Sequence, residues 1–148
     1  MYSDNSTILL VEDEPTDVFL TQRAFHKAKI SHPLQVVEDG DAAIDYLSGN
    51  GDYGNREQYP LPILILLDLK LPRCSGLEVL EWLKQQPHLK RLPVVVLTSS
   101  NITDDVNQAY DLGVNSYIVK PVGFNHLLTV ISCINEYWLV LNEKPEIF

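Results

Sequence analysis

Five short apolar runs constrain the fold of this chain more than any other feature of its sequence. Most of them are continuously apolar and do not alternate with polar residues, which is typical of strands buried on both faces of a parallel sheet. The runs span residues 7–11, 34–37, 63–67, 94–97 and 117–119. A stretch with helical spacing of apolar residues follows each run. This alternation predicts a doubly wound α/β fold with right-handed crossovers and helices on both faces of the sheet, in three α/β/α layers.

The stretches between the runs carry helix signals. Pro15 can occupy the first position of the first helix, and Gly113 can end the fourth helix. The last helix is predicted over residues 124–141. Residues 48–62 differ because they are rich in Gly, Asn and Pro, and they predict a long, partly frayed loop before the third strand.

The length and composition suit one globular domain. The chain has 148 residues, of which 45% are hydrophobic and 21% charged, and a chain of this size can bury a core without disulfides or metals. Its net charge of −9 argues against nucleic-acid binding, which needs a basic surface. We therefore expect residues 1–148 to form a single domain that binds no nucleic acid.

Cysteine usage and the N-terminal residues indicate the compartment. Cys74 and Cys133 do not have a metal-ligand spacing, and we interpret them as free thiols in a reducing compartment. Residues 1–6 contain neither a basic residue nor a long apolar stretch, so no signal peptide is predicted. No run reaches the roughly 18 apolar residues of a membrane span. We expect a soluble, cytoplasmic protein with no membrane contact.

Polar residues capable of chemistry follow four of the apolar runs. In open α/β sheets, ligands bind at the carboxyl ends of the strands. The residues at these ends are, in chain order, Glu12-Asp13-Glu14, Asp68, Thr98-Ser99-Ser100 and Lys120-Pro121. If the first, third, fourth and fifth strands are neighbours, carboxylates, a hydroxyl and an ammonium meet along one edge of the sheet.

This combination of groups fits phosphoryl transfer to a carboxylate. Clustered carboxylates raise one another's pKa unless a cation lies among them, and oxygen ligands suit Mg²⁺. An ion held by Asp13 and Asp68 would neutralise an incoming phosphoryl group, and a carboxylate can then act as the nucleophile. Lys120 can pair with one phosphoryl oxygen, and the Thr98 hydroxyl can donate to another.

Each of these residues also has an ordinary explanation when taken alone. Glu12 and Asp13 could be solvated surface acids. Asp68 could cap a turn and Thr98 could cap the following helix, while Lys120 could be a surface lysine. Suitable residue types at four strand ends, in chain order, nevertheless favour the functional interpretation of the set.

Four motifs are specific as a set. They are Ile8-Leu9-Leu10-Val11-Glu12-Asp13, Leu66-Leu67-Asp68-Leu69-Lys70-Leu71-Pro72 with Ser75-Gly76, Val96-Leu97-Thr98, and Tyr117-Ile118-Val119-Lys120-Pro121. With them the sequence resembles bacterial two-component response-regulator receiver domains along nearly its whole length. The resemblance implies a flavodoxin-like sheet in the strand order 2-1-3-4-5. It also implies that residues 1–148 are one receiver domain without an output domain, and not an enzyme beyond its own phosphotransfer and autodephosphorylation.

The resemblance assigns a role to each motif residue. It implies that Asp68 is the phosphoacceptor and that Asp13 is a Mg²⁺ ligand, with Glu12 acting on the metal through water. The backbone carbonyl of Lys70 would be a further metal ligand. The bond between Lys120 and Pro121 is expected to be cis, which marks a constrained turn.

The resemblance also implies a conformational switch. Thr98 would move toward the phosphoryl group, and Tyr117 would rotate inward and change the face formed by the fourth helix, the fifth strand and the fifth helix. Tyr117 could instead be an edge-strand aromatic that packs on the sheet. Ser99 stands where many members have a small residue such as alanine, and Lys70 is long and cationic, so the lifetime of the phosphorylated state is left open.

A closer resemblance is to the small regulators that partner bacterial phytochromes. It rests on residues 48–62, on residues 92–100 and on Tyr137-Trp138. It implies a phytochrome-type sensor histidine kinase as the phosphodonor, and a homodimer. The output would be a protein contact, or passage of the phosphoryl group to a histidine phosphotransfer protein.

The predicted last helix carries two apolar stripes. The inner stripe, expected to pack on the sheet, consists of Leu127, Ile131, Ile134, Trp138 and Leu141. The outer stripe consists of Val130, Cys133, Tyr137 and Val140. A second stripe on a terminal helix suggests a partner, so we expect a homodimer interface there. The alternative is that the tail or the fourth helix covers the outer stripe.

Three other functions were weighed against this one. A phosphatase with an aspartate nucleophile on a similar fold usually carries a second aspartate two residues later, where this chain has Lys70. A binding module that no longer takes phosphate is disfavoured by the intact set of polar residues at the strand ends. A flavin-binding protein would need a phosphate-binding loop after the first strand, where Glu12-Asp13-Glu14 would repel phosphate in the absence of a metal.

Overall fold

A five-stranded parallel sheet forms the centre of the molecule. The structure, a computed structural model, describes residues 6–147. The strand order is β2-β1-β3-β4-β5 and all neighbouring strands are parallel, which confirms the predicted fold. The strands are β1 (Ile8–Val11), β2 (Leu34–Val37), β3 (Leu64–Leu67), β4 (Val94–Thr98) and β5 (Ser116–Val119).

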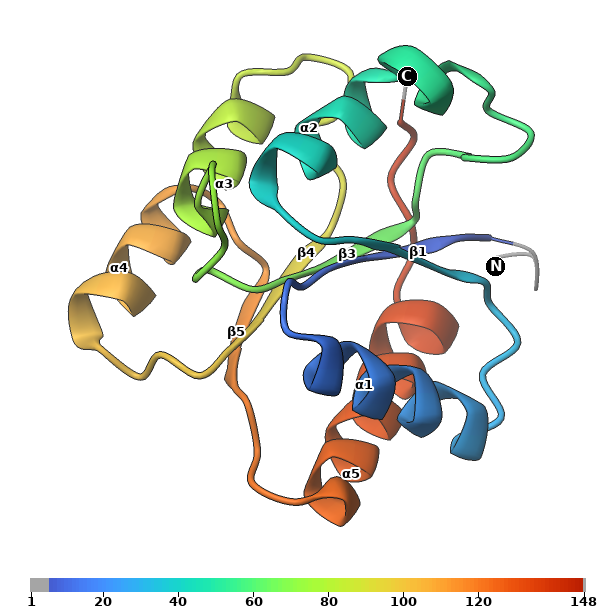
Figure 1. Cartoon of the computed structure of the whole chain (residues 1–148), viewed down its shortest axis with the longest axis vertical. Helices are drawn as coiled ribbons and strands as arrows, with labels where there is room; N and C mark the ends of the chain where they lie inside the picture. The colour runs from blue at the N-terminus through green and yellow to red at the C-terminus, as the bar shows by residue number, and fades with distance from the viewer. Residues whose placement is uncertain (1–5, 148) are drawn as a thin grey trace.

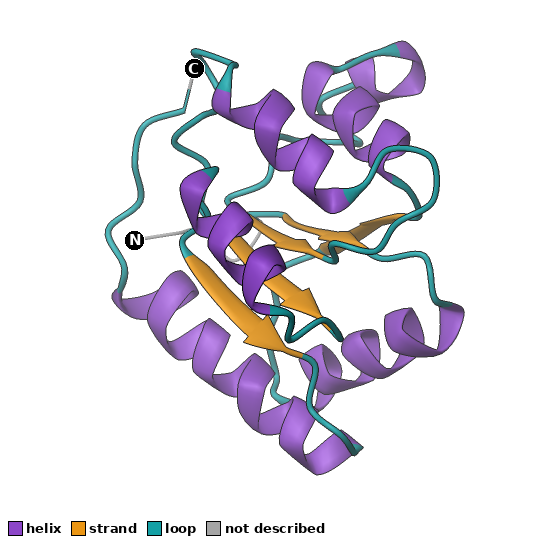
Figure 2. Cartoon of the chain, turned by 90° about the vertical axis from the view of Figure 1, so that its left-hand side faces the viewer, coloured by secondary structure: helices purple, strands orange, loops and turns teal. Residues whose placement is uncertain are grey.

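Helices cover both faces of this sheet (Figures 1 and 2). The helices α1 (Pro15–Lys27) and α5 (Phe124–Ile134) lie on one face and contact each other. The helices α2 (Gly40–Ser48), α3 (Gly76–Lys84) and α4 (Thr103–Asp111) lie on the other face. None of the helices between residues 6 and 147 combines the length and the apolar character that a membrane crossing requires.

The continuous apolar runs reflect two cores, one on each face of the sheet. Along β1, Ile8 and Leu10 pack with α1 and α5, whereas Leu9 and Val11 pack with α2 and α3. All four side chains are buried, because successive residues of a strand point to opposite faces and both faces are covered. The amphipathic helices supply the complementary apolar faces.

The end of the chain departs from the predicted helix over residues 124–141. The α-helix α5 ends at Ile134, and residues Asn135–Leu141 form a π-helical segment, η2. A π-helix has a wider turn than an α-helix, so the buried side of the segment changes. Leu141, predicted in the inner stripe, is 64% exposed, and Leu139 is buried instead. The prediction for Leu141 was therefore wrong.

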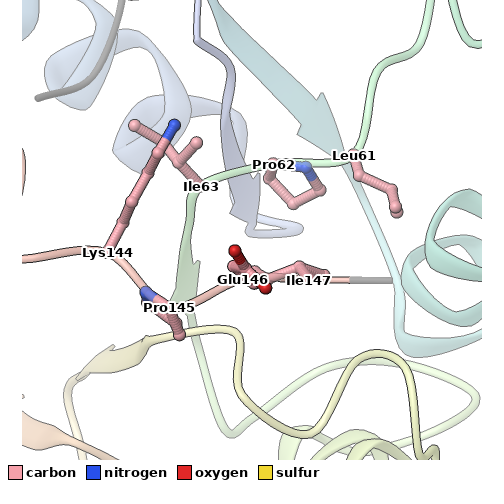
Figure 3. A pocket seen from close by; sticks show the side chains of 7 residues that line it. All are labelled: Leu61, Pro62, Ile63, Lys144, Pro145, Glu146 and Ile147. Carbon is pink, nitrogen blue, oxygen red and sulfur yellow. The ribbon is translucent and has the colours of Figure 1, made fainter.

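The tail after η2 lies along the sheet end opposite the strand ends that carry the polar residues. Ile147 packs against the core on the α2 and α3 side. A solvent-open pocket of about 350 Å³ lies between the tail and the segment leading into β3 (Figure 3). It is lined by Leu61, Pro62, Ile63, Lys144, Pro145, Glu146 and Ile147.

The region 48–62, expected to be partly frayed, is held by Arg56. Its guanidinium donates to the carbonyls of Tyr46, Leu47 and Tyr59 at 2.7–3.2 Å. It thereby satisfies backbone acceptors at the C-terminal end of α2, which an α-helix leaves unpaired. The short 3₁₀ segment η1 (Gly51–Gly54) follows α2, and the rings of Tyr46, Tyr53 and Tyr59 contact one another.

Candidate functional site

The polar residues predicted from the strand ends meet at one edge of the sheet. The order β1-β3-β4-β5 places the carboxyl ends of these strands side by side. Asp68, which follows β3, lies at the centre of the group. The Thr98 hydroxyl donates to Asp68 Oδ1 at 2.7 Å, and the Lys120 ammonium donates to Asp68 Oδ2 at 2.9 Å.

The surroundings of Asp68 favour its ionised form. Its side chain is buried, and burial acts to raise the pKa, but the hydrogen bonds from Thr98 and Lys120 and the positive charge of Lys120 hold the pKa below its ordinary value. The Lys70 backbone N–H donates to Oδ1 at 3.1 Å. Asp68 is therefore a carboxylate at neutral pH, which is the form that can act as a nucleophile.

Close packing of α3 against the loop after β3 fixes the backbone of Asp68. A Cβ atom on Gly76 would lie 2.3 Å from the Asp68 carbonyl oxygen and 2.6 Å from the Leu69 Cα. The Gly76 N–H donates to the Leu69 carbonyl at 2.9 Å. Ser75 begins α3 with a capping box that includes Glu78. The Ser75-Gly76 motif thus allows the helix to begin in contact with the site.

Three carboxylates gather where a divalent cation would bind. Glu12, Asp13 and Asp68 each offer an oxygen, and these oxygens lie within 4.8 Å of one another. Glu12 is buried and Asp13 is exposed. Burial raises the pKa of Glu12 to about 7, although the hydrogen bonds from Lys120 and from the Glu14 N–H act to lower it. An all-oxygen set of this kind fits a hard divalent ion.

Lys120 connects the carboxylates, and one of its partners was missed by the sequence reasoning. Its ammonium contacts Glu12, Asp68 and also Asp17, whose Oδ2 lies 2.8 Å from Nζ. Burial acts to lower the pKa of Lys120, but the hydrogen bonds to Asp17, Glu12 and Asp68 hold the pKa above its ordinary value. The only sequence signal for Asp17 is an acid in the first turn of α1, which ordinarily complements the helix dipole.

Tyr117, the predicted switch residue, is half-buried and is hydrogen-bonded to the loop after β4. Its hydroxyl donates to the Ser100 carbonyl at 2.8 Å. The Ser100 hydroxyl in turn donates to Asp105 Oδ2 at 2.6 Å, at the start of α4. Ser99 is exposed and Ser100 is buried. The contact connects β5 with the segment that begins at Thr98.

The expected cis bond before Pro121 is wrong, because residues 6–147 contain no cis peptide bond. Trans is the favoured isomer of an X–Pro bond by about 0.5–1 kcal/mol. With the trans bond in place, the Lys120 N–H donates to the Thr98 carbonyl at 2.7 Å. The Lys120 ammonium reaches Asp68 with the bond in this form.

The family model of the response regulator receiver domain matches residues 8–132. The chain belongs to this family. The matched range contains each of the strand-end residues described above, and the observed sheet order is the one that the resemblance implied.

Two relatives match this receiver domain along most of their length. The probable methanogenesis regulatory protein FilR2 of Methanothrix harundinacea is 42% identical over 142 residues, covering 96% of this chain and 89% of the relative. The response regulator Rcp1 of Synechocystis is 46% identical over 132 residues, covering 89% of this chain and 88% of the relative.

Solved structures agree with this family assignment. The phosphorylated cyanobacterial phytochrome response regulator RcpA matches with a TM-score of 0.89 at 42% identity, covering 96% of this chain and 99% of RcpA. The Mn²⁺-bound form of Rcp1 matches with a TM-score of 0.85 at 44% identity, covering 95% and 99% of the two chains.

The Lys70 side chain and most of the outer stripe of the receiver domain are exposed. The Lys70 side chain is exposed, at the position where an aspartate-nucleophile phosphatase carries its second acid. In the outer stripe, Val130 packs partly on the core, whereas Cys133, Tyr137 and Val140 are exposed. Neither the tail nor α4 covers these three side chains. Cys74 and Cys133 are free thiols, as predicted.

Proposed function

We propose that Asp68 accepts a phosphoryl group from a phosphohistidine, with Mg²⁺ held by Asp13, Asp68 and the Lys70 carbonyl and by Glu12 through water. The observation that carries this proposal is the ionised, buried Asp68 carboxylate between a hydroxyl, an ammonium and two further carboxylates. The carboxylate cluster fits a divalent ion, and Mg²⁺ is the common ion for phosphoryl groups.

The proposed reaction transfers the phosphoryl group directly from the histidine to Asp68. An Asp68 carboxylate oxygen forms a bond to phosphorus while the phosphorus–nitrogen bond of the phosphohistidine breaks, and the imidazole leaves with its electron pair. The bound ion supplies charge neutralisation for the phosphoryl oxygens. Lys120 and the Thr98 hydroxyl are close enough to Asp68 to turn their N–H and O–H donors to two of these oxygens. Attack of water on phosphorus later releases phosphate and restores Asp68.

The output of the proposed reaction is a changed surface. Thr98 leads into the segment whose Ser100 carbonyl accepts from Tyr117. Movement of this segment toward a phosphoryl group would therefore pull on Tyr117, and it would alter the face formed by α4, β5 and α5. We propose that the signal passes to a partner protein or to a histidine phosphotransfer protein.

We propose a phytochrome-type sensor histidine kinase as the phosphodonor, in the cytoplasm. The support is the similarity to RcpA, which is a cyanobacterial phytochrome response regulator, and to a bacteriophytochrome response regulator at 47% identity over 95% of this chain, with a TM-score of 0.76. FilR2 is similarly identical to this chain, so similarity alone does not select the phosphodonor. The control is therefore to compare phosphotransfer from a phytochrome-type kinase with phosphotransfer from a second, non-phytochrome histidine kinase. Faster transfer from the second kinase would contradict the proposal.

We also propose that two copies associate through the outer stripe. Tyr137 and Val140 are 52% and 62% exposed, and the neighbouring Leu141 is 64% exposed. Exposed apolar side chains that lie together on one terminal segment favour an interface. Two-fold association would let the same patch serve both copies.

The phosphoacceptor proposal is tested with acetyl phosphate and Mg²⁺, using the intact mass of the protein as the readout. We expect a phosphoryl adduct on the wild type, which is absent from Asp68→Asn and lost when the metal is chelated. Failure of the wild type to form an adduct across a series of Mg²⁺ concentrations and sampling times would overturn the proposal.

A further inference from the structure

The Lys120 ammonium has three N–H donors, and the structure gives it three carboxylate partners. Glu12 and Asp68 follow strands, whereas Asp17 comes from the first turn of α1. The Glu12 and Asp68 side chains are 3% and 7% exposed, and that of Asp17 is 37% exposed. Asp17 is thus the outermost of the three partners.

The three partners differ in their relation to the proposed metal site. Glu12 and Asp68 belong to the cluster of oxygens that lie within 4.8 Å of one another, and Asp17 does not. A divalent ion in the cluster would therefore compete with Lys120 for Glu12 and Asp68. Asp17 alone would hold the ammonium without sharing its oxygens with the ion.

Lys120 has room to leave the site. Asp17 and Lys120 both line a cavity of about 120 Å³ between α1 and the start of α5, together with apolar residues such as Leu97 and Phe124. A lysine has a flexible four-carbon stem with strongly variable reach. A fixed anion beside the ammonium would limit this movement and keep Nζ within hydrogen-bond distance of Asp68.

We propose that Asp17 is a positioning residue for phosphoryl transfer: it holds the Lys120 ammonium at Asp68 while a metal ion and a phosphoryl group engage the other carboxylates. This inference rests on the proposed function. When the phosphoryl group forms on Asp68, Lys120 turns one N–H to a phosphoryl oxygen and keeps its contact with Asp17. The donor is then in place before the reaction, and it does not have to be recruited during the reaction.

The kinetic test compares the same Asp→Asn change in the first turn of two helices. In Asp17→Asn the shape is kept and the charge removed, and we expect the rate of adduct formation at saturating acetyl phosphate and Mg²⁺ to fall about 3–10-fold. Asp41→Asn is the matched control: Asp41 is an exposed acid in the first turn of α2, and it is not among the carboxylates that contact Lys120. It should stay within about twofold of the wild type. Asp17→Glu should restore most of the rate.

A second readout follows the ammonium directly, without phosphodonor. In protein labelled with ¹⁵N-lysine, the Lys120 ammonium resonance is assigned by its loss in Lys120→Arg. We expect Asp17→Asn to shift this resonance and to speed its proton exchange with water, and Asp41→Asn to leave both unchanged. A role of Asp17 limited to helix stability would lower the unfolding temperature and leave the resonance where it is.

The outcomes separate this inference from the proposed function. If the wild type forms an adduct on Asp68, and Asp17→Asn matches Asp41→Asn in rate and in the Lys120 resonance, the positioning role is overturned while the phosphoacceptor function stands. If the wild type forms no adduct, both fall together. A slower Asp17→Asn with an altered Lys120 resonance, rescued by Asp17→Glu, supports the positioning role.

Discussion

Glu12 and Asp68 share one site, yet their surroundings act on them in opposite directions. Burial dominates at Glu12 and raises its pKa to about 7. At Asp68 the donors Thr98, Lys120 and the Lys70 N–H outweigh burial and lower the pKa. Near neutral pH the site therefore holds one carboxylate that is always available and a second whose charge depends on whether a cation is present.

The raised pKa of Glu12 predicts how stability depends on pH in the absence of metal. Below about pH 4.5 the carboxyl group is protonated in both the folded and the unfolded state. As the pH rises to about 7, the unfolded state loses the proton first, so the free energy of unfolding should fall by about 3 kcal/mol. Urea denaturation in the presence of a chelator, at a series of pH values, measures this change.

The control for this prediction is Glu12→Gln, which cannot titrate. The stability of this variant should lack that part of the fall between pH 4.5 and 7, and the difference between the two proteins isolates Glu12 from other titrating groups. Saturating Mg²⁺ should make the fall in the wild type smaller, because an ion stabilises the ionised form. Equal slopes for the variant and the wild type would show that Glu12 is ionised throughout this range.

At the scale of elements, the contact between α3 and the loop after β3 holds the acceptor in place. The Gly76 Cα lies so close to the Asp68 backbone that a methyl group would require one of them to move. The obstacle is backbone, which cannot rotate away as a long side chain can. The geometry of Asp68 therefore depends on the packing of a helix as well as on its own side-chain partners.

Replacing Gly76 by alanine should disturb both stability and phosphorylation. We expect Gly76→Ala to lower the free energy of unfolding by about 1–3 kcal/mol through overpacking, and to slow adduct formation with acetyl phosphate. Gly76→Ser should have an effect at least as large. Urea denaturation and intact-mass kinetics measure the two changes. A variant with unaltered stability and rate would show that α3 can shift without moving Asp68.

Arg56 should have a structural effect without a chemical one. Arg56→Ala leaves the carbonyls of Tyr46, Leu47 and Tyr59 without their charged donor, and we expect a loss of about 1–3 kcal/mol in stability. Proteolysis in the region 48–62 should become faster, while the initial phosphorylation rate should stay near that of the wild type. Exposed Arg91 provides the control, because Arg91→Ala should change neither property. Unchanged proteolysis of Arg56→Ala would mean that the tyrosine rings alone order the region.

At the scale of the whole molecule, the two faces of the sheet carry different candidate interaction features. On one face, α5 continues into η2, whose exposed side carries Tyr137, Val140 and Leu141. The opposite side carries α2, α3 and α4, and Tyr117 and Ser100 connect β5 to the segment that precedes α4. Asp68 is thus connected through Thr98 and the following Ser100 to Tyr117, the proposed switch residue.

The proposed homodimer makes a prediction for the assembled molecule. Val140→Glu should weaken association at least 10-fold, because two copies of the charge would be buried in a two-fold interface. Light scattering at several concentrations, with and without phosphodonor, measures the mass. Phe19→Glu introduces the same charge at a residue with similar exposure (60%) on α1, and this variant should retain the dimer. A monomer mass for the wild type at every concentration and in both states would contradict the proposal.

The apolar runs and the residues after them were enough to predict a doubly wound parallel sheet and the set Glu12, Asp13, Asp68, Thr98 and Lys120, whereas the strand order came from the resemblance to receiver domains. The reason is that continuous apolar runs mark strands covered on both faces, and parallel strands bring their carboxyl ends to one edge. The identity of the residue after each strand then specifies the chemistry of the edge. These are local properties of the chain, and they survive folding unchanged.

The tertiary structure decided what depends on distant contacts. Asp17 meets Lys120 across 103 positions of the sequence, and nothing in the first turn of a helix indicates which lysine it will face. The wider turn of η2 exchanged Leu139 for Leu141 as the buried residue. The Arg56 guanidinium donates to three carbonyls that the sequence does not relate to it. Periodicity and strand-end rules describe neighbours along the chain, whereas these features depend on residues that only folding brings together.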